Sequence, residues 1–397
     1  MSQELEFSIM GDSPANIQPL LDQFKVEQGI HVHLNVLPWD LAWSQLAKVA
    51  IYGDGPDVSE IGSTWVGDLA GMNALRPFSV REIMTLGGAF SFLPSAWRGG
   101  ALAGEEQQSA IPWLTGARLL YYRRNLLKRA GVDERTAFQS TEQLEQTASR
   151  LHAKGVAVPW TVPTNVTHTT LLNVASWVWC AGGDFVSADG KRLLFGEPRA
   201  RAGLRAYFAL GRYLAPSVLH LKGLEPDEQF LSNEETAMTI SGPWLFLAAR
   251  GRMAPEALAQ LGVVLPFGAS FIGGSHLVIW NHTRKEEAAT KLIRFLTQPS
   301  AQITYSQKTG LLPARLDALS APPFSTDPLW QVAVKGLTTG RTFPTTRSWG
   351  LIEDKLVAEL GAIWSEVLAN PDAELGAMVL KHIEPLAQRL KLRLEQK

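Results

Sequence analysis

One short stretch carries residue types suited to holding a flat, polar ligand. Residues 235–247 read ETAMTISGPWLFL, and residues 237–240 form an apolar run long enough for a buried strand. Gly242 and Pro243 break that run, because glycine permits unusual backbone angles and proline cannot donate to a strand ladder. Trp244 follows, at the passage from strand to helix. Ligands bind beyond the carboxyl ends of strands in open α/β sheets, so Trp244 and Gly242 are candidate contacts; a purely structural Trp244 is the alternative.

The spacings that enzymes and metal sites require are missing from the sequence. It has no Gly-x-Ser-x-Gly, no His-Glu-x-x-His, no zinc-binding Cys/His spacing and no dinucleotide fingerprint. His31 and His33 share one face of a predicted strand, but no third ligand lies near them in sequence. We therefore predict no catalytic residues, no metal and no cofactor. Paired carboxylates of a carbohydrate-active enzyme stay an alternative, because such residues can lie far apart in the chain.

Composition favours a globular protein of two domains. The chain has 397 residues, more than one ordinary core accommodates, with 46 % hydrophobic residues and a net charge of −1. This balance argues against a nucleic-acid partner, which would favour a basic face. One cysteine allows no intramolecular disulfide. The 13 Trp residues stand out, since aromatic faces stack on sugar rings; large buried area is their other common use.

The first sixty residues alternate between strand and helix patterns. Alternating apolar residues predict strands at 5–10 and 30–37, helical spacing predicts a helix at 16–28, and a further strand is predicted at 58–61. Such an order implies parallel strands with right-handed crossovers. Asp40 stands where a helix cap is expected after the second strand. The loop after the third strand is expected to face a ligand, and its residues are Ser63, Thr64 and Trp65.

Several segments resemble the extracytoplasmic solute-binding proteins of ABC importers, in particular the carbohydrate-binding group that includes the maltose-binding proteins. The most specific match is AMTISGPW at 237–244. Together the matches cover most of the chain; the others are GDGPDV at 53–58, a Pro-aromatic…Tyr-Tyr…Leu-Leu segment at 112–127, Trp…Gly-Gly at 177–183, Gly-Gly…Ile at 273–279, Gly-x-x-Pro-x-Arg at 310–315 and Pro…Trp at 344–349. Gly116 stands where maltose-binding proteins carry an acidic ligand residue, which weighs against a maltodextrin ligand.

The resemblance implies an α/β, two-domain periplasmic-binding-protein fold of the Venus flytrap type, with a ligand cleft at the hinge. We expect an N-terminal α/β domain built from residues 1–113 and 272–315, and a C-terminal α/β domain built from 118–266 and 322–397. Hinge crossings are expected near 113–118, 266–272 and 315–322.

The same resemblance implies a set of ligand contacts. The tryptophan matching Trp244 stacks on a sugar ring in that family. Trp177 and Trp179 point about 200° apart on a helix, so at most one should reach the ligand. His168 could donate to a ligand or cap a helix, and Arg347 could clamp a ligand oxygen or form a structural salt bridge. The full predicted set is Asp12, Trp39, Asp40, Ser63, Thr64, Trp65, Trp113, Asn165, His168, Trp177, Gly242, Trp244, Gly273, Gly274, Arg347 and Trp349.

By this resemblance the protein is expected to capture a sugar or oligosaccharide and deliver it to the permease of an ABC transporter. An anionic sugar or polyol, phosphorylated or sulfonated, is the alternative ligand. A monomer at the periplasm or cell surface is expected. The first residues lack the basic, apolar and small-residue pattern of a signal peptide, and under this reading the signal sequence is absent from this chain.

Overall fold

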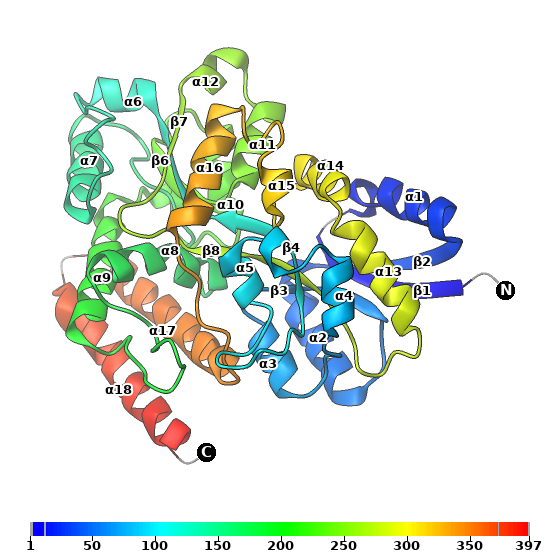
Figure 1. Ribbon diagram of the computed structural model, residues 1–397. Helices are drawn as coiled ribbons and strands as arrows, with labels where there is room; N and C mark the ends of the chain where they lie inside the picture. Colours follow the sequence, from blue (N-terminus) through cyan, green and yellow to red (C-terminus); the bar gives the residue numbers. More distant parts are fainter. Residues whose placement is uncertain (1–2, 12, 372, 396–397) are drawn as a thin grey trace. The chain divides into compact units, whose positions relative to one another are not determined.

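The computed structural model describes residues 3–11, 13–371 and 373–395, and its chain divides into two compact units (Figure 1). Unit 1 comprises residues 1–116, 273–327 and 342–350, and unit 2 comprises 117–272, 328–341 and 351–397. Residues 342–350, which the sequence prediction assigned to the C-terminal domain, belong to unit 1. The two units are described separately below.

Unit 1 is built on a mixed six-stranded sheet in the order β2-β1-β3-β8-β4-β9. Its first three strands pair in parallel through the central β1, as predicted from the strand–helix alternation, and β8 and β9 join antiparallel. The strands are β1 (Gln3–Met10), β2 (Ile30–Leu37), β3 (Val58–Gly62), β4 (Ile111–Ala117), β8 (Ile272–Ile279) and β9 (Leu312–Pro313).

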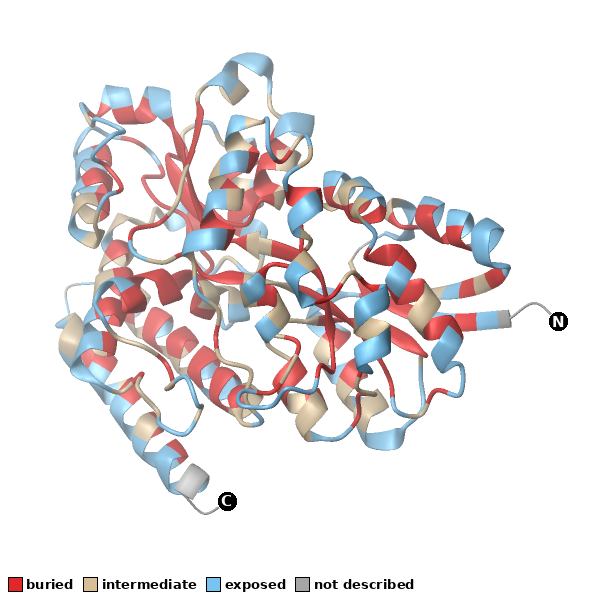
Figure 2. Ribbon diagram, in the orientation of Figure 1, coloured by how far each residue is buried: buried red, intermediate tan, exposed pale blue. Residues whose placement is uncertain are grey.

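Helices cover both faces of the unit 1 sheet. In β8, Leu277 and Ile279 belong to the core cluster that includes α1 and α13, whereas Val278 belongs to the cluster that includes α2 and α3. Side chains alternate across a strand, so both faces of β8 are apolar, and β3, β4 and β8 are mostly buried, whereas the edge strand β2 is partly exposed (Figure 2). The helices are α1 (Gln18–Gln28), α2 (Trp39–Tyr52), α3 (Val66–Gly71), α4 (Val80–Thr85), α5 (Pro94–Arg98), α13 (Glu286–Leu296), α14 (Pro299–Thr309) and α15 (Leu316–Leu319), with 3-10 turns η1 (Pro14–Asn16) and η2 (Ala89–Ser91).

Local sequence signals set the ends of two helices in unit 1. Gly29 ends α1 with a left-handed φ of 67°, a conformation that glycine adopts at low cost. Ser79 and Glu82 form a capping box at the start of α4. Asp40 does not cap α2, because the cap position is Pro38 and no side chain makes a cap bond there. Proline already fixes φ at that position, and the helix starts two residues earlier than a cap at Asp40 requires.

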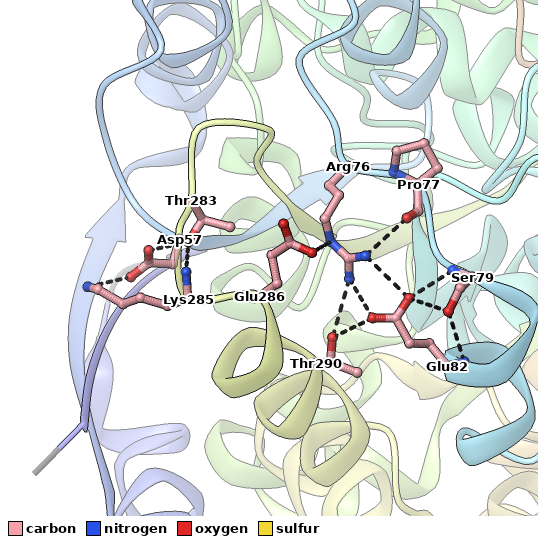
Figure 3. A network of polar contacts seen from close by, with 9 residues as sticks. All are labelled: Asp57, Arg76, Pro77, Ser79, Glu82, Thr283, Lys285, Glu286 and Thr290. Atoms are coloured by element: carbon pink, nitrogen blue, oxygen red, sulfur yellow. Dashed lines mark hydrogen bonds and ion pairs between the residues drawn. The ribbon is translucent and has the colours of Figure 1, made fainter.

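A polar network ties α13 and α4 to the loops around them (Figure 3). Arg76 donates to Glu82 Oε1 at 2.7 Å, and Thr290 of α13 donates to the same oxygen at 3.0 Å. Nearby, Thr283 donates to Asp57 at 2.5 Å, and Lys285 pairs with Asp57 at 3.1 Å. Two of these contacts join segments that are more than two hundred residues apart in the chain: Thr290 and Glu82 are separated by 208 positions, and Thr283 and Asp57 by 226.

Unit 2 contains a three-stranded antiparallel sheet in the order β6-β5-β7, with helices around it. The strands are β5 (Leu119–Arg123), β6 (Met238–Ser241) and β7 (Leu261–Val264). The helices are α6 (Arg124–Arg129), α7 (Thr141–Ala153), α8 (His168–Cys180), α9 (Pro198–Phe208), α10 (Glu225–Ser232), α11 (Trp244–Arg252), α12 (Pro255–Ala259), α16 (Pro328–Thr339), α17 (Trp349–Ala369, which begins in unit 1) and α18 (Leu375–Glu395), with 3-10 turns η3 (Ala209–Tyr213) and η4 (Pro216–Val218).

One short apolar segment of unit 2 does not form a full strand. Residues 156–161 form only isolated parallel bridges, Val158 with Thr236 and Thr161 with Thr239. Val158 and Trp160 are buried, so the apolar pattern is genuine. A short apolar run indicates burial more reliably than it indicates a hydrogen-bonded ladder.

Candidate functional site

In unit 2, the turn between β6 and α11 holds Trp244 in one orientation. The indole N–H of Trp244 donates to Oδ2 of Asp227 at 2.8 Å, and the Ser241 hydroxyl donates to the same oxygen at 2.7 Å. The ring lies flat against Gly242, since a Cβ there would come within 2.0, 2.2 and 2.4 Å of three ring atoms. Trp244 is only half-buried. The turn therefore presents a fixed and partly exposed indole.

Charged groups of both signs lie next to this ring. Asp227, in the first turn of α10, is 7 % exposed. Burial raises the pKa of Asp227 to about 6, against the hydrogen bonds from Ser241 and Trp244 and the nearby charge of Arg118. The Arg118 guanidinium lies 5.2 Å from the centroid of the Trp244 ring. An aromatic face beside a carboxylate and a guanidinium suits a ligand that has both C–H surface and hydroxyl groups.

In unit 1, the turn after β3 repeats the arrangement of glycine followed by tryptophan. The Trp65 ring lies over Gly62, where a Cβ would sit 3.2–3.4 Å from ring atoms, and Trp65 is half-buried. Ser63 donates its backbone N–H to the Gly274 carbonyl at 2.9 Å. Within the described residues, the hydroxyls of Ser63 and Thr64 make no hydrogen bond to protein, and both residues are partly exposed. These hydroxyls are therefore free to bind a polar ligand.

A buried carboxylate lies in β3, two residues before this turn. Glu60 is 2 % exposed, and it accepts the backbone N–H of Met10 at 2.8 Å. Burial raises the pKa of Glu60 to about 7 against this hydrogen bond. Glu60 was not a predicted site residue, since a single Glu inside an apolar strand carries no recognisable spacing.

One of the two glycines of β8, Gly274, is explained by strand packing. At Gly274 a Cβ would lie 2.1 Å from the Leu114 carbonyl oxygen and 2.7 Å from the Thr115 Cα, and φ is +145°. Gly274 thus lets β8 approach β4 closely, which is a structural reason for glycine and not a ligand contact. Gly273, beside it, is half-buried.

Three predicted contacts lie in the core and are corrected. Trp113 is 0 % exposed and stacks on Tyr305 at 4.8 Å. Trp177 is 0 % exposed and meets Tyr207 edge-on at 5.0 Å. Trp349 is 1 % exposed and stacks on Phe343 with ring centroids 4.3 Å apart. These rings have no free face for a ligand.

The predicted loop residues of unit 2 have mixed surroundings. The Asn165 amide donates to the His220 carbonyl, so this side chain ties two loops together. Thr167, and not His168, caps α8, by accepting the Thr169 N–H at 3.3 Å. His168 is the first residue of α8 and is exposed. Of the two, His168 retains the more accessible side chain.

The remaining predicted residues belong to unit 1. Trp39 and Asp40 are exposed in the first turn of α2, with Trp39 50 % exposed. Arg347 is exposed and donates to Glu105 at 3.0 Å, so its charge is paired. Asp12 lies outside the described residues.

Sequence reasoning missed Arg118 and Asp227. Arg118 lies between β4 and β5, and Asp227 stands in the first turn of a helix, where acidic residues are common without any site. The only available signal was indirect: Asp227 lies seventeen positions before Trp244. Their proximity depends on tertiary structure.

The described part of the chain also limits other kinds of site. Among its residues, no group of three or more His, Cys, Asp or Glu is arranged to hold a metal ion. None of its helices combines the length and apolar character needed to cross a bilayer.

Sequence comparison finds a family that spans most of the chain. The model of the family described as bacterial extracellular solute-binding protein matches residues 20–332. A probable ABC transporter-binding protein of Deinococcus radiodurans is 24 % identical over 232 residues, which cover 54 % of this chain and 54 % of that relative, about half its length. A putative binding protein of Brucella abortus is 22 % identical over 294 residues, covering 72 % of this chain and 69 % of the relative.

Solved structures share the fold over nearly the full length. A solute-binding protein of Thermotoga lettingae bound to α-D-tagatose has a TM-score of 0.84 at 21 % identity, covering 99 % of this chain and 100 % of that one. The maltose-bound MalE3 of T. maritima gives 0.83 at 22 %, covering 98 % and 99 %. UgpB of Mycobacterium tuberculosis, in complex with glycerophosphocholine, gives 0.81 at 20 %, covering 100 % and 99 %. The fold is therefore the two-domain α/β fold of periplasmic binding proteins.

Proposed function

The chain belongs to the family of bacterial extracellular solute-binding proteins, which are extracytoplasmic and not enzymes, and we propose that it binds a neutral sugar or short oligosaccharide and delivers it to an ABC-type permease. We further propose that it does so as a monomer. The named role of the Deinococcus radiodurans relative supports the transporter partnership. The proposal includes no catalytic step.

The observation that carries the proposal is the fixed, partly exposed ring of Trp244. Its N–H is bound to Asp227 and its ring lies on Gly242, so little freedom is lost when a ligand packs against it. Preorganisation of this kind favours affinity. The C–H face of a sugar offers the apolar surface that an indole prefers.

Unit 1 supports a hydroxyl-rich ligand through its own turn. The free hydroxyls of Ser63 and Thr64 act as both donors and acceptors, as do sugar hydroxyls. An anionic ligand would gain most from a cation whose charge is not balanced, but Arg347 is paired with Glu105 at 3.0 Å, and the charge of Arg118 is opposed by that of Asp227. The neutral ligand is therefore the first proposal.

Ligands of the structural neighbours define the probes for a test. D-Tagatose, maltose, acarbose and glycerophosphocholine occur with proteins of this fold. We would titrate each into the protein by calorimetry. We expect saturable binding of a neutral sugar, and Trp244→Ala should weaken it about 10–100-fold, since an aromatic anchor carries about 1.5–3 kcal/mol.

Trp97→Phe is the matched control, because Trp97 is a half-buried ring of unit 1 that packs on Phe92 at 5.4 Å. It should bind as the wild type does. Equal weakening in both variants would argue against a ligand contact at Trp244. Binding of glycerophosphocholine alone would replace the neutral sugar by the anionic alternative, and consumption of any probe would reopen the enzyme alternative.

A further inference from the structure

Arg118 has a largely buried side chain whose guanidinium group has no hydrogen-bond acceptor in the described protein. The residue is 7 % exposed, and among the described residues its side chain donates to no protein oxygen. Its main chain is held on both sides: the N–H donates to Phe271 O at 3.0 Å, and the carbonyl accepts the Ser270 hydroxyl at 2.5 Å. These two backbone contacts fix the main chain of Arg118, while the N–H groups of its guanidinium have no acceptor in the described protein.

Arg123, five residues along the same strand region, shows what a structural arginine looks like here. It is 2 % exposed and lies 5.1 Å over the Phe230 ring. Its guanidinium donates to the carbonyls of Phe230 at 2.7 Å and Thr236 at 3.2 Å. Arg118 and Arg123 are thus alike in burial and in their aromatic contact. They differ in that only Arg123 has its donors satisfied.

The unpaired donors of Arg118 reach solvent. Although the residue is only 7 % exposed, none of its guanidinium nitrogens is among the fully buried side-chain nitrogen and oxygen atoms that lack a partner in the described residues. Burial lowers the pKa of Arg118 to about 10, with the charge of Asp227 opposing, so the group stays protonated at neutral pH. Asp227 does not accept from these donors, since the two residues form neither an ion pair nor a hydrogen bond and its Oδ2 is taken by Ser241 and Trp244. A ligand oxygen can therefore replace water at these donors.

The position of the guanidinium indicates where that acceptor lies. Arg118 is over the ring of Trp244 at 5.2 Å, beside the partly exposed indole. A ligand packed at this ring would bring its oxygen atoms near the donors of Arg118. The planar fork of arginine donates to two adjacent oxygens at once, which lysine cannot do.

We propose that Arg118 is a ligand-binding residue that donates paired hydrogen bonds to two adjacent hydroxyl oxygens of a neutral sugar or polyol seated at Trp244. This inference rests on the proposed function and adds a specificity-determining residue to it. The carboxylate of Asp227 balances the charge of the Arg118 guanidinium, so these two groups together carry no net charge when a neutral ligand is bound. An added phosphate would leave an excess negative charge there, which is unfavourable in a low dielectric.

The test compares Arg118→Lys with Arg123→Lys in the full chain. The ligand-free proteins are unfolded by heat, and D-tagatose, maltose and D-tagatose 6-phosphate are titrated by calorimetry. Arg118→Lys should lower the affinity for the neutral sugar that binds by about 10-fold or more, with a Tm within about 2 °C of wild type, because no protein hydrogen bond is lost. Arg123→Lys should lower Tm by about 4 °C or more and change the affinity less than about 3-fold.

The outcomes separate this inference from the proposed function. Unchanged sugar affinity in Arg118→Lys, or a Tm loss equal to that of Arg123→Lys, would assign Arg118 a structural role and overturn the inference. Tighter binding of D-tagatose 6-phosphate than of D-tagatose would overturn the neutral class. If the wild type binds no sugar, the proposed function fails. The comparison of Tm values between Arg118→Lys and Arg123→Lys then still tests the role of Arg118: an unchanged Tm in Arg118→Lys would support a guanidinium group without a protein acceptor.

Discussion

Trp244 donates its indole N–H to Asp227 across 2.8 Å, from the first residue of α11 to the first turn of α10. The carboxylate is 7 % exposed, so this bond is made away from water. A buried acceptor fixes a ring more firmly than a solvated one, because no water competes for the N–H. The orientation of the candidate ligand contact therefore depends on Asp227.

Asp227→Ala should weaken sugar binding about as strongly as loss of the ring itself. The change leaves the Trp244 N–H and the Ser241 hydroxyl without their acceptor, at a cost of about 1–3 kcal/mol. Ser241→Ala is the matched control, since it removes one donor to Asp227 and leaves the bond from Trp244 intact. Calorimetric titration with D-tagatose and maltose checks both variants. Equal affinities for Asp227→Ala and wild type would show that the ring is held by other contacts.

Gly242→Ala should disturb Trp244 directly. The new Cβ would lie 2.0 Å from a ring atom, so the indole must leave its position or the turn must shift, with a loss of about 1–3 kcal/mol in unfolding free energy. Gly251, in the same helix α11, has nothing within 4 Å of its Cβ position. Gly251→Ala should stabilise the protein by about 0.5–1 kcal/mol through helix propensity. Denaturant unfolding and sugar titration measure both variants, and a fully stable, fully binding Gly242→Ala would contradict this geometry.

Local patterns were enough to predict the parallel core of unit 1. The strands β1, β2 and β3 were recognised from alternation and length. Their parallel direction followed from the alternation of strands and helices along the chain. The glycine and tryptophan of the turn after β6 were also recognised, because turn residues act locally. The pairing partners of later strands depend on contacts distant in sequence and were not derivable.

Which tryptophans are buried was not derivable either. Trp113 lies in β4, whose neighbours on the sheet and Tyr305 of α14 cover it, and a strand buried on both faces shows no alternation to separate its sides. Trp349 is enclosed because residues 342–350 pack on α3. There a Cβ at Gly67 would lie 2.3 Å from the Thr346 carbonyl oxygen. Such a close approach of two backbones is visible only in the folded chain.

Acid should weaken unit 1 through Glu82 (Figure 3). Burial alone would raise the pKa of Glu82, but hydrogen bonds from Arg76, Ser79 and Thr290 outweigh it and lower the pKa to about 2. Since the unfolded value is near 4.5, the ionised group stabilises the fold above that pH, and this contribution disappears as the pH falls from 4.5 to 2. Glu82→Gln should therefore cost about 2 kcal/mol at pH 7 and almost nothing at pH 2.

Glu287→Gln is the control for this comparison, because Glu287 pairs with Lys291 on the exposed side of the same helix that Thr290 belongs to. Its stability profile should follow that of the wild type from pH 7 to pH 2. Urea unfolding at several pH values measures all three proteins. A constant difference between Glu82→Gln and wild type over this range would exclude the proposed linkage.

Glu60 should have the opposite dependence on pH. Burial raises its pKa in the folded protein to about 7 from 4.5, so between these values the folded state binds a proton that the unfolded state has released. Stability from this group is then complete below about pH 4.5 and is lost as the pH rises through 7. Glu60→Gln keeps an acceptor for the Met10 N–H and removes the charge. It should leave stability at pH 4.5 nearly unchanged and raise it by about 2–3 kcal/mol at pH 8.

The test is urea unfolding of Glu60→Gln and wild type at pH 4.5, 6 and 8, with Glu6→Gln on the exposed side of β1 as control. A gain that grows with pH in Glu60→Gln alone would show that folding raises the pKa of this carboxyl group, and a gain of about 2–3 kcal/mol at pH 8 would match ionisation near pH 7. A gain of the same size at every pH would mean that folding does not shift the pKa of Glu60, and a loss at every pH would mean that Gln cannot replace it sterically. Because Glu60 lies in β3, three residues before Ser63, ligand titrations of the wild type and of Glu60→Gln at pH 6 and pH 8 would directly measure whether the charge of Glu60 affects binding at the hydroxyls of Ser63 and Thr64.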